Sequence, residues 1–186
     1  DAAFFEEECL GRFAGIQSDP NDNARAYVIE REEKLAQCFA AVIVDQTHVP
    51  THRSLRWQVL AARVRGGILH AKLTLLVWQT RIRMLVGSAN LTEPGYRRNL
   101  ENMAVFEFGQ APEDGGPLEL LEGALDYLEH ARSLAAGAEA TSGPQAGLRR
   151  FLGTVRRLSS DWQSPSRPRS EPRAHLLDIR PGRPTL

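Results

Sequence analysis

Five side chains that could together form a phosphate site lie near one another in the middle of the sequence. An imidazole can attack phosphorus or protonate a leaving oxygen, and a carboxylate can orient that imidazole. An ammonium group and a carboxamide can hold phosphate oxygens, so this chemistry needs no metal ion. The five residues predict cleavage of a phosphodiester, and they are His70, Lys72, Ser88, Asn90 and Glu101.

The expected secondary structure brings the imidazole and the ammonium group together. Residues 68–78 are an apolar run typical of a buried strand. His70 and Lys72 are two positions apart, and side chains at that spacing project from the same face of a strand. A charged group in the centre of an apolar strand is costly without a partner, so this placement favours a site over a structural role.

A hairpin should bring in the other polar side chains. Residues 82–86 predict a return strand that ends at Gly87, where the lack of a side chain lets backbone N–H groups approach an anion. The hairpin places Ser88 and Asn90 opposite His70. Taken singly, each feature also fits a structural role, because a serine and an asparagine are common at the exit of a strand and a glutamate before a strand is usually solvated.

The spacing of these residues resembles a half-site of the phospholipase D superfamily, in which His-x-Lys is followed by Gly-Ser-x-Asn and then by a glutamate. The resemblance covers residues 39–108 and matches His70, Lys72, the Gly87–Asn90 motif and Glu101. It implies a mixed β-sheet flanked by helices, forming one half of a pseudo-twofold catalytic unit. It also implies a phosphohistidine intermediate, with the histidine of a second half-site exchanging protons with the substrate.

One departure from the commonest pattern narrows the expected substrate. That pattern has an aspartate five residues after the lysine, where this chain has Val77. Its absence makes the chain similar to the branch that includes tyrosyl-DNA phosphodiesterase and some restriction and repair nucleases. The resemblance therefore implies a nuclease or DNA-end-processing phosphodiesterase, with DNA preferred to RNA and nucleic acid preferred to phospholipid.

The resemblance also assigns a role to each site residue. His70 would attack phosphorus, or protonate the leaving group if the partner histidine attacks. Lys72 and Asn90 would neutralise the charge that grows on the non-bridging oxygens. Glu101 would accept the Nδ1–H of His70, and Ser88 would donate to the phosphate or to Glu101.

Only one His-x-Lys pair is present, because none of the other histidines (His48, His52, His130 and His175) has a lysine two positions later. The chain is expected to be a homodimer protomer or, with a slight preference, the first half of a longer protein. Residues 1–163 would form the catalytic half-domain, and residues 164–186 a linker or the start of a second half. His48 and His52 lie in a predicted loop with no cysteine pair nearby, so no metal and no cofactor are expected.

Charge is unevenly distributed although the net charge is zero. Residues 46–100 carry nine Lys and Arg against one acidic residue, whereas residues 1–45 carry four against ten. A basic block around a phosphate site suits a polyanion such as nucleic acid. The arginines expected to bind it are Arg97 and Arg98, which are closest to the site in sequence, followed by Arg81 and Arg83.

The remaining pattern predicts an α/β fold. Helices are expected up to residue 15 and over residues 30–37, 118–134 and 148–158. Further strands are expected over residues 26–29, 39–44, 56–65 and 102–108. No apolar run of membrane-spanning length and no signal peptide is present, so no membrane partner and a cytoplasmic location are expected.

Three other interpretations stay open. A phospholipase would need an apolar docking surface, whereas residues 46–100 offer arginines. A non-catalytic nucleic-acid-binding module would keep the basic face without the chemistry, and this is the more serious rival. A structural half that completes another chain's site is a weaker form of the same idea.

Overall fold

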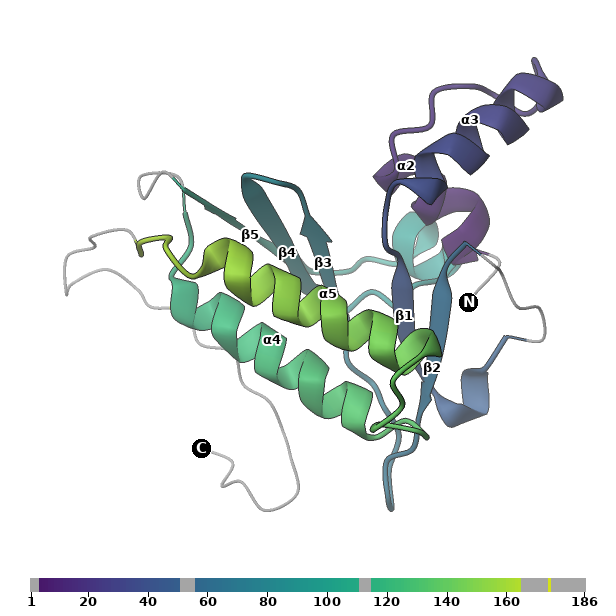
Figure 1. The fold of residues 1–186 in the computed structure, drawn as a ribbon. Helices are drawn as coiled ribbons and strands as arrows, with labels where there is room; N and C mark the ends of the chain where they lie inside the picture. Colours follow the sequence, from purple (N-terminus) through teal and green to yellow (C-terminus); the bar gives the residue numbers. More distant parts are fainter. Residues whose placement is uncertain (1–3, 51–55, 111–114, 165–173, 175–186) are drawn as a thin grey trace.

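The chain combines short strands and helices, and two adjacent helices near its C-terminal end lie across the strands (Figure 1). A computed structural model describes residues 4–50, 56–110, 115–164 and 174. The α/β class predicted from the sequence is confirmed, with two small sheets in place of a single mixed one. The elements are η1 (Phe5–Leu10), α2 (Gly11–Phe13), α3 (Ala24–Ala36), β1 (Ala41–Asp45), η2 (Gln46–His48), β2 (Gln58–Ala62), β3 (Leu73–Val77), β4 (Arg81–Gly87), η3 (Pro94–Arg98), β5 (Met103–Gly109), α4 (Leu118–Ser133) and α5 (Gly143–Ser159).

The first sheet consists of β1 and β2, which pair in parallel with Ile43 opposite Leu60. Alternate side chains of these strands enter two different cores. Ile43 and Leu60 join the core that includes α4 and α5, whereas Val42 and Val59 pack with the N-terminal helical segment and Leu35 of α3. Both faces of the sheet are therefore covered, as is usual for parallel strands.

The second sheet is antiparallel, in the order β3-β4-β5. Leu75 lies opposite Met84, which lies opposite Phe106, and these side chains face the core shared with α4 and α5. On the other face, Leu85 lies opposite Val105, which is 53% exposed. This sheet is thus packed against the helices on one face and open at Val105 on the other.

Two helices pack against both sheets. Figure 1 shows α4 and α5 side by side across the strands. Leu121 and Leu125 of α4 and Leu152 and Val155 of α5 are at most 2% exposed. Their spacing of three or four residues gives each helix one apolar face, which is why the sequence pattern predicted both helices correctly.

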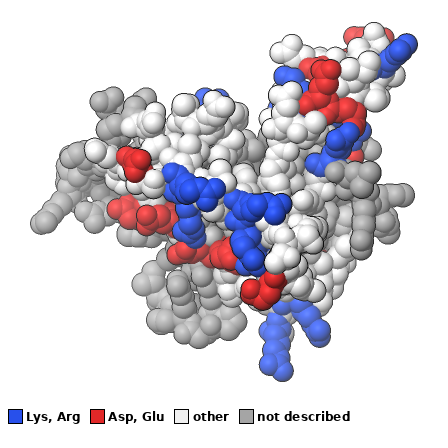
Figure 2. Space-filling view, in the orientation of Figure 1, with Lys and Arg blue, Asp and Glu red and all other residues white. Residues whose placement is uncertain are grey.

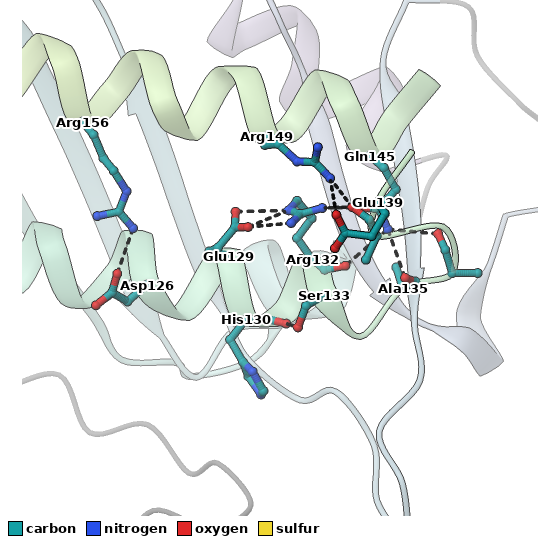
Figure 3. A network of polar contacts seen from close by, with 12 residues as sticks. Asp126, Glu129, His130, Arg132, Ser133, Ala135, Glu139, Gln145, Arg149 and Arg156 are labelled. Carbon is teal, nitrogen blue, oxygen red and sulfur yellow. Dashed lines mark hydrogen bonds and ion pairs between the residues drawn. The ribbon is translucent and has the colours of Figure 1, made fainter. Parts of the chain in front are cut away.

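A buried polar network stabilises the turn that connects α4 and α5 (Figure 3). Gln145 and Arg132 are buried, and the Arg132 guanidinium donates to Gln145 Oε1 over 2.9 Å and to the Ala138 carbonyl over 2.8 Å. Gln145 Nε2 donates to the carbonyls of Ala135 and Ala136 over 3.1 and 3.0 Å. Buried polar groups need such partners, so the network fixes the course of this turn.

The predicted strand over residues 26–29 is wrong, because these residues belong to α3. The Asn23 side chain caps this helix by accepting from the Ala26 backbone N–H over 3.0 Å. Val28 and Ile29 are 54% and 51% exposed, so the β-branched pair that suggested a strand has no core to enter. A helix satisfies its own backbone groups, and α3 projects from the rest of the chain in Figure 1.

The predicted linker over residues 164–186 falls outside the described residues except at residues 164 and 174. Ser164 Oγ accepts a hydrogen bond from the Leu118 backbone N–H at the start of α4. Within the described part of the chain, no helix combines the length and apolarity needed to cross a bilayer. Cys9 and Cys38 are free thiols.

Candidate active site

His70 does not lie inside a strand, contrary to the sequence prediction. β3 begins at Leu73, and His70 is exposed in the irregular segment that leads into it. The physical reason is that the Leu69 backbone N–H donates to the Asp45 carboxylate over 2.8 Å instead of to a neighbouring strand. The imidazole therefore stands at the end of the sheet, where solvent and a substrate can reach it.

The imidazole and the ammonium group are nevertheless together, as the spacing predicted. Lys72 Nζ lies 2.8 Å from both ring nitrogens of His70 and 3.0 Å from the His70 carbonyl oxygen. An ammonium group can only donate, so the nitrogen that accepts from it must carry a lone pair. This contact places an imidazole and a positive charge at one spot.

The hairpin end supplies a second polar group. Ser88 Oγ donates to Glu101 Oε2 over 2.5 Å, and Asn99 Nδ2 donates to Glu101 Oε1 over 3.1 Å. Both carboxylate oxygens thus have partners other than His70, which departs from the expected Glu101–His70 contact. Ser88 adopts the second of its two expected roles, as a donor to Glu101.

Backbone contacts hold these side chains at the junction of three strand ends. The Gly87 N–H donates to the Lys72 carbonyl over 3.2 Å, and the Ser88 N–H donates to the Asn102 carbonyl over 3.0 Å. The Asn102 N–H returns a bond to Ser88 Oγ over 3.1 Å. A Cβ at Gly87 would lie 2.5 Å from the Asn102 carbonyl oxygen, so only glycine allows this close approach.

Asn90 lies after β4 and is exposed. Its backbone is fixed by a bond from the Thr92 N–H to its carbonyl over 2.8 Å. Gly95 packs against the same backbone, because a Cβ there would lie 2.4 Å from the Asn90 carbonyl oxygen. Among the hydrogen bonds of the described residues, none joins the Asn90 side chain to the other four site residues.

The charges of the cluster interact. Hydrogen bonds from Ser88 and Asn99, together with the positive charge of Lys72, hold the pKa of Glu101 below its ordinary value. Burial lowers the pKa of Lys72, and the Glu101 carboxylate opposes that effect. The structure therefore gives two side-chain pairs, His70 with Lys72 and Ser88 with Glu101, that interact through the charges of Lys72 and Glu101.

The four arginines expected to bind nucleic acid all have partners. Arg97 pairs with Glu8, Arg98 with Glu93 and Arg83 with Glu107. The Arg81 guanidinium lies 4.5 Å from the centre of the Trp78 ring, which is a cation–π contact. The excess positive charge of residues 46–100 is thus partly matched by Glu8 and Glu107 from other parts of the chain and by Glu93 within it.

The same mixing of charge occurs on the helical face. Figure 2 shows basic and acidic side chains interspersed on the side that α4 and α5 form. Arg156 pairs with Asp126 over 2.8 Å, and Arg149 lies 3.9 Å from Glu139. The helix α5 therefore does not form a purely positive surface there.

The sequence pattern did not identify three residues that support the site. Asn99 donates to Glu101, Gly95 sets the backbone of Asn90, and Asp45 bonds the residue before His70. Asp45 follows an apolar strand and precedes a threonine by two positions, a pattern typical of a side chain that caps a turn. That pattern predicts the turn at Thr47. It could not predict the bond to Leu69, because Leu69 is distant in sequence.

Over the residues that the structure describes, no group of three or more His, Cys, Asp or Glu side chains could hold a metal ion. His52 and His175, which the sequence analysis considered, lie outside those residues. Comparison of the chain with protein-family models, curated proteins and solved structures finds no match.

Proposed function

We propose that this chain is one half of a metal-independent phosphodiesterase of the phospholipase D type that acts on nucleic acid, with DNA preferred to RNA. The observation that carries the proposal is the contact of Lys72 Nζ with the His70 ring, beside a carboxylate bonded to Ser88. These residues supply a nucleophile or proton donor, a cation and a carboxylate that holds its neighbours, which suits phosphoryl transfer because this chemistry depends mainly on positioning and charge stabilisation.

In the proposed reaction, His70 forms a bond to phosphorus while the bond from phosphorus to the leaving oxygen breaks. That oxygen takes a proton from an imidazole of a second half-site. A water molecule then gives a proton to the second imidazole and attacks phosphorus, and the phosphorus–nitrogen bond of His70 breaks. If the second imidazole attacks first, His70 supplies and recovers the proton instead.

The clamp on the phosphate would come from Lys72 and Asn90. Lys72 has three donors, so it can turn from the imidazole towards a phosphate oxygen as the substrate enters. Asn90 is exposed on a backbone that Gly95 and Thr92 fix, and its carboxamide is available to a substrate. Glu101 would keep Ser88 and the ammonium group in place.

Exposed apolar residues beside the site support the need for a second half. Leu100, which precedes Glu101, is 103% exposed, and Met103 and Val105 on β5 are 44% and 53% exposed. Neighbouring apolar side chains in water indicate a surface that another protein segment covers. We propose that a second half-site, in a longer chain or in a second copy, docks beside these residues.

The test is to trap the covalent intermediate. DNA and RNA oligonucleotides with labelled phosphates are mixed with the chain and quenched, and acid-labile label on the protein is measured together with hydrolysis of bis(p-nitrophenyl) phosphate. We expect His70→Ala to lower hydrolysis by at least about 10²-fold, the smaller effect usual for general acid–base groups. It should also remove the label if His70 is the attacking imidazole.

His130→Ala is the matched control, because this histidine lies on α4. It should leave both measurements unchanged. An unchanged rate in His70→Ala would refute the assignment. A wild-type chain that is dimeric by sedimentation and retards DNA in a gel, but neither takes up label nor hydrolyses the ester, would be the non-catalytic binding module instead.

A further inference from the structure

A buried carboxylate lies beneath the segment that carries His70. Asp45 is the last residue of β1 and is 7% exposed. Among the described residues it is the only acidic side chain that is buried to this degree. A buried charge is costly unless hydrogen bonds compensate it, so its partners show what it holds in place.

The two carboxylate oxygens of Asp45 serve two different segments. Oδ1 accepts from the Thr47 backbone N–H over 3.0 Å and from Thr47 Oγ1 over 2.7 Å, which caps the short helix η2. Oδ2 accepts from the Leu69 N–H over 2.8 Å. The first oxygen fixes a local turn, and the second reaches a segment that is distant in sequence.

The bond to Leu69 lies immediately before His70. On the other side of His70, the Lys72 carbonyl accepts from the Gly87 N–H over 3.2 Å. The backbone of His70 is thus held at both ends, although its side chain is exposed and in contact with Lys72. Because an exposed side chain has little packing to orient it, these two backbone bonds fix the point from which the imidazole extends towards Lys72.

We propose that Asp45 is a positioning residue for His70, acting through the Leu69 backbone N–H. Its catalytic consequence rests on the proposed function, whereas the positioning itself does not. The carboxylate is ionised in the folded chain, because the bonds from Thr47 and Leu69 hold its pKa at about 2. Hydrogen bonds from a backbone N–H to an ionised acceptor are stronger than neutral ones, which suits an anchor of this kind.

Two substitutions separate the two functions of the carboxylate. Asp45→Ser keeps a side-chain oxygen that can cap the Thr47 N–H, but its side chain is too short to reach Leu69. Thr47→Val removes the hydroxyl bond to Asp45 and leaves the Leu69 bond in place. Val155→Ala, at a fully buried position of α5, is a control for a general loss of stability.

The measurements are hydrogen exchange of the Leu69 amide and the ring resonances of His70 by NMR at one pH. We expect Asp45→Ser to speed exchange at Leu69 by about tenfold or more, the effect of losing one hydrogen bond. It should also shift the His70 ring resonances. Thr47→Val and Val155→Ala should change neither the Leu69 exchange rate nor the His70 resonances relative to the rest of the chain.

Equal behaviour of Asp45→Ser and Thr47→Val at Leu69 and His70 would overturn the proposal. So would a shift of the same size in Val155→Ala, because positioning would then be indistinguishable from general loosening. The kcat for bis(p-nitrophenyl) phosphate is measured on the same samples. If a wild-type chain that is dimeric by sedimentation hydrolyses no ester while Asp45→Ser still moves the His70 resonances, the proposed function fails and the positioning role stands.

Discussion

Replacing Gly87 by alanine tests the backbone junction on which the site is built. A Cβ at this position would lie 2.5 Å from the Asn102 carbonyl oxygen and 3.3 Å from the Met103 Cα. The atom in the way is backbone, so it cannot swing aside as a side chain would. Strands β4 and β5 must separate at the point where the Ser88 N–H bonds the Asn102 carbonyl.

The expected loss of stability in Gly87→Ala follows from the cost of adding a methyl group at a tightly packed position. Such overpacking destabilises a protein by about 1–3 kcal/mol. For a chain of this size, each kcal/mol lowers Tm by about 2–4 °C. Gly87→Ala should therefore lower Tm by about 2–12 °C in thermal unfolding followed by circular dichroism.

A glycine-to-alanine substitution within a helix should raise Tm instead of lowering it. Gly153 lies within α5, where a Cβ would meet only the end of the Arg157 side chain, 3.6 Å away. Alanine in a helix interior is favoured over glycine by about 0.5–1 kcal/mol, so Gly153→Ala should raise Tm by about 1–4 °C. If Gly87→Ala is neutral or stabilising like Gly153→Ala, the strand ends are not as close as described and the site geometry is wrong.

The remaining predictions concern the buried network, acid stability and the exposed apolar residues. Gln145→Ala should destabilise the chain by about 2–4 kcal/mol in urea unfolding, because it leaves buried carbonyls in the α4–α5 turn without donors. The exposed Gln163→Ala should stay within about 0.5 kcal/mol, and a similar loss in both would contradict the network. The pKa of Asp45 is about 2 in the folded chain, below its ordinary value of 3.8. Its contribution to stability should therefore be complete above about pH 4 and disappear as the pH falls towards 2, so an acid titration of stability should be flatter in Asp45→Ser than in the wild type. Leu100 is fully exposed, so Leu100→Lys should change the unfolding free energy of this chain by no more than about 0.5 kcal/mol. A larger loss would mean that Leu100 is packed within the chain.

The elements with a strong repeating pattern could be predicted from the sequence. The return strand over residues 82–86 appears as β4, and the apolar spacing of residues 118–134 appears as α4. In each case the same face is buried along the whole element, so a local pattern carries the information. The predicted strand over residues 26–29 failed because a run of four residues has too little pattern to outweigh the cap at Asn23.

The details of the site depended on contacts between distant residues. Asp45 and Leu69 are 24 positions apart, and their bond is what keeps His70 out of the strand. Glu8 and Arg97 are 89 positions apart, and their pairing could not be read from the separate charged blocks. The approach of His70 to Lys72 was expected from their spacing, but the strand on which that expectation rested does not include His70.

The pairing of arginines with carboxylates changes what salt should do to any polyanion bound here. The affinity of a protein for DNA falls with salt in proportion to the number of counterions that its cations displace from the phosphates. An arginine that must first leave Glu8, Glu93 or Glu107 frees a carboxylate that repels the same phosphates. Binding becomes an exchange of partners with little net gain in ion release. The slope of log affinity against log salt concentration should therefore be shallower than the number of arginines near the site would give.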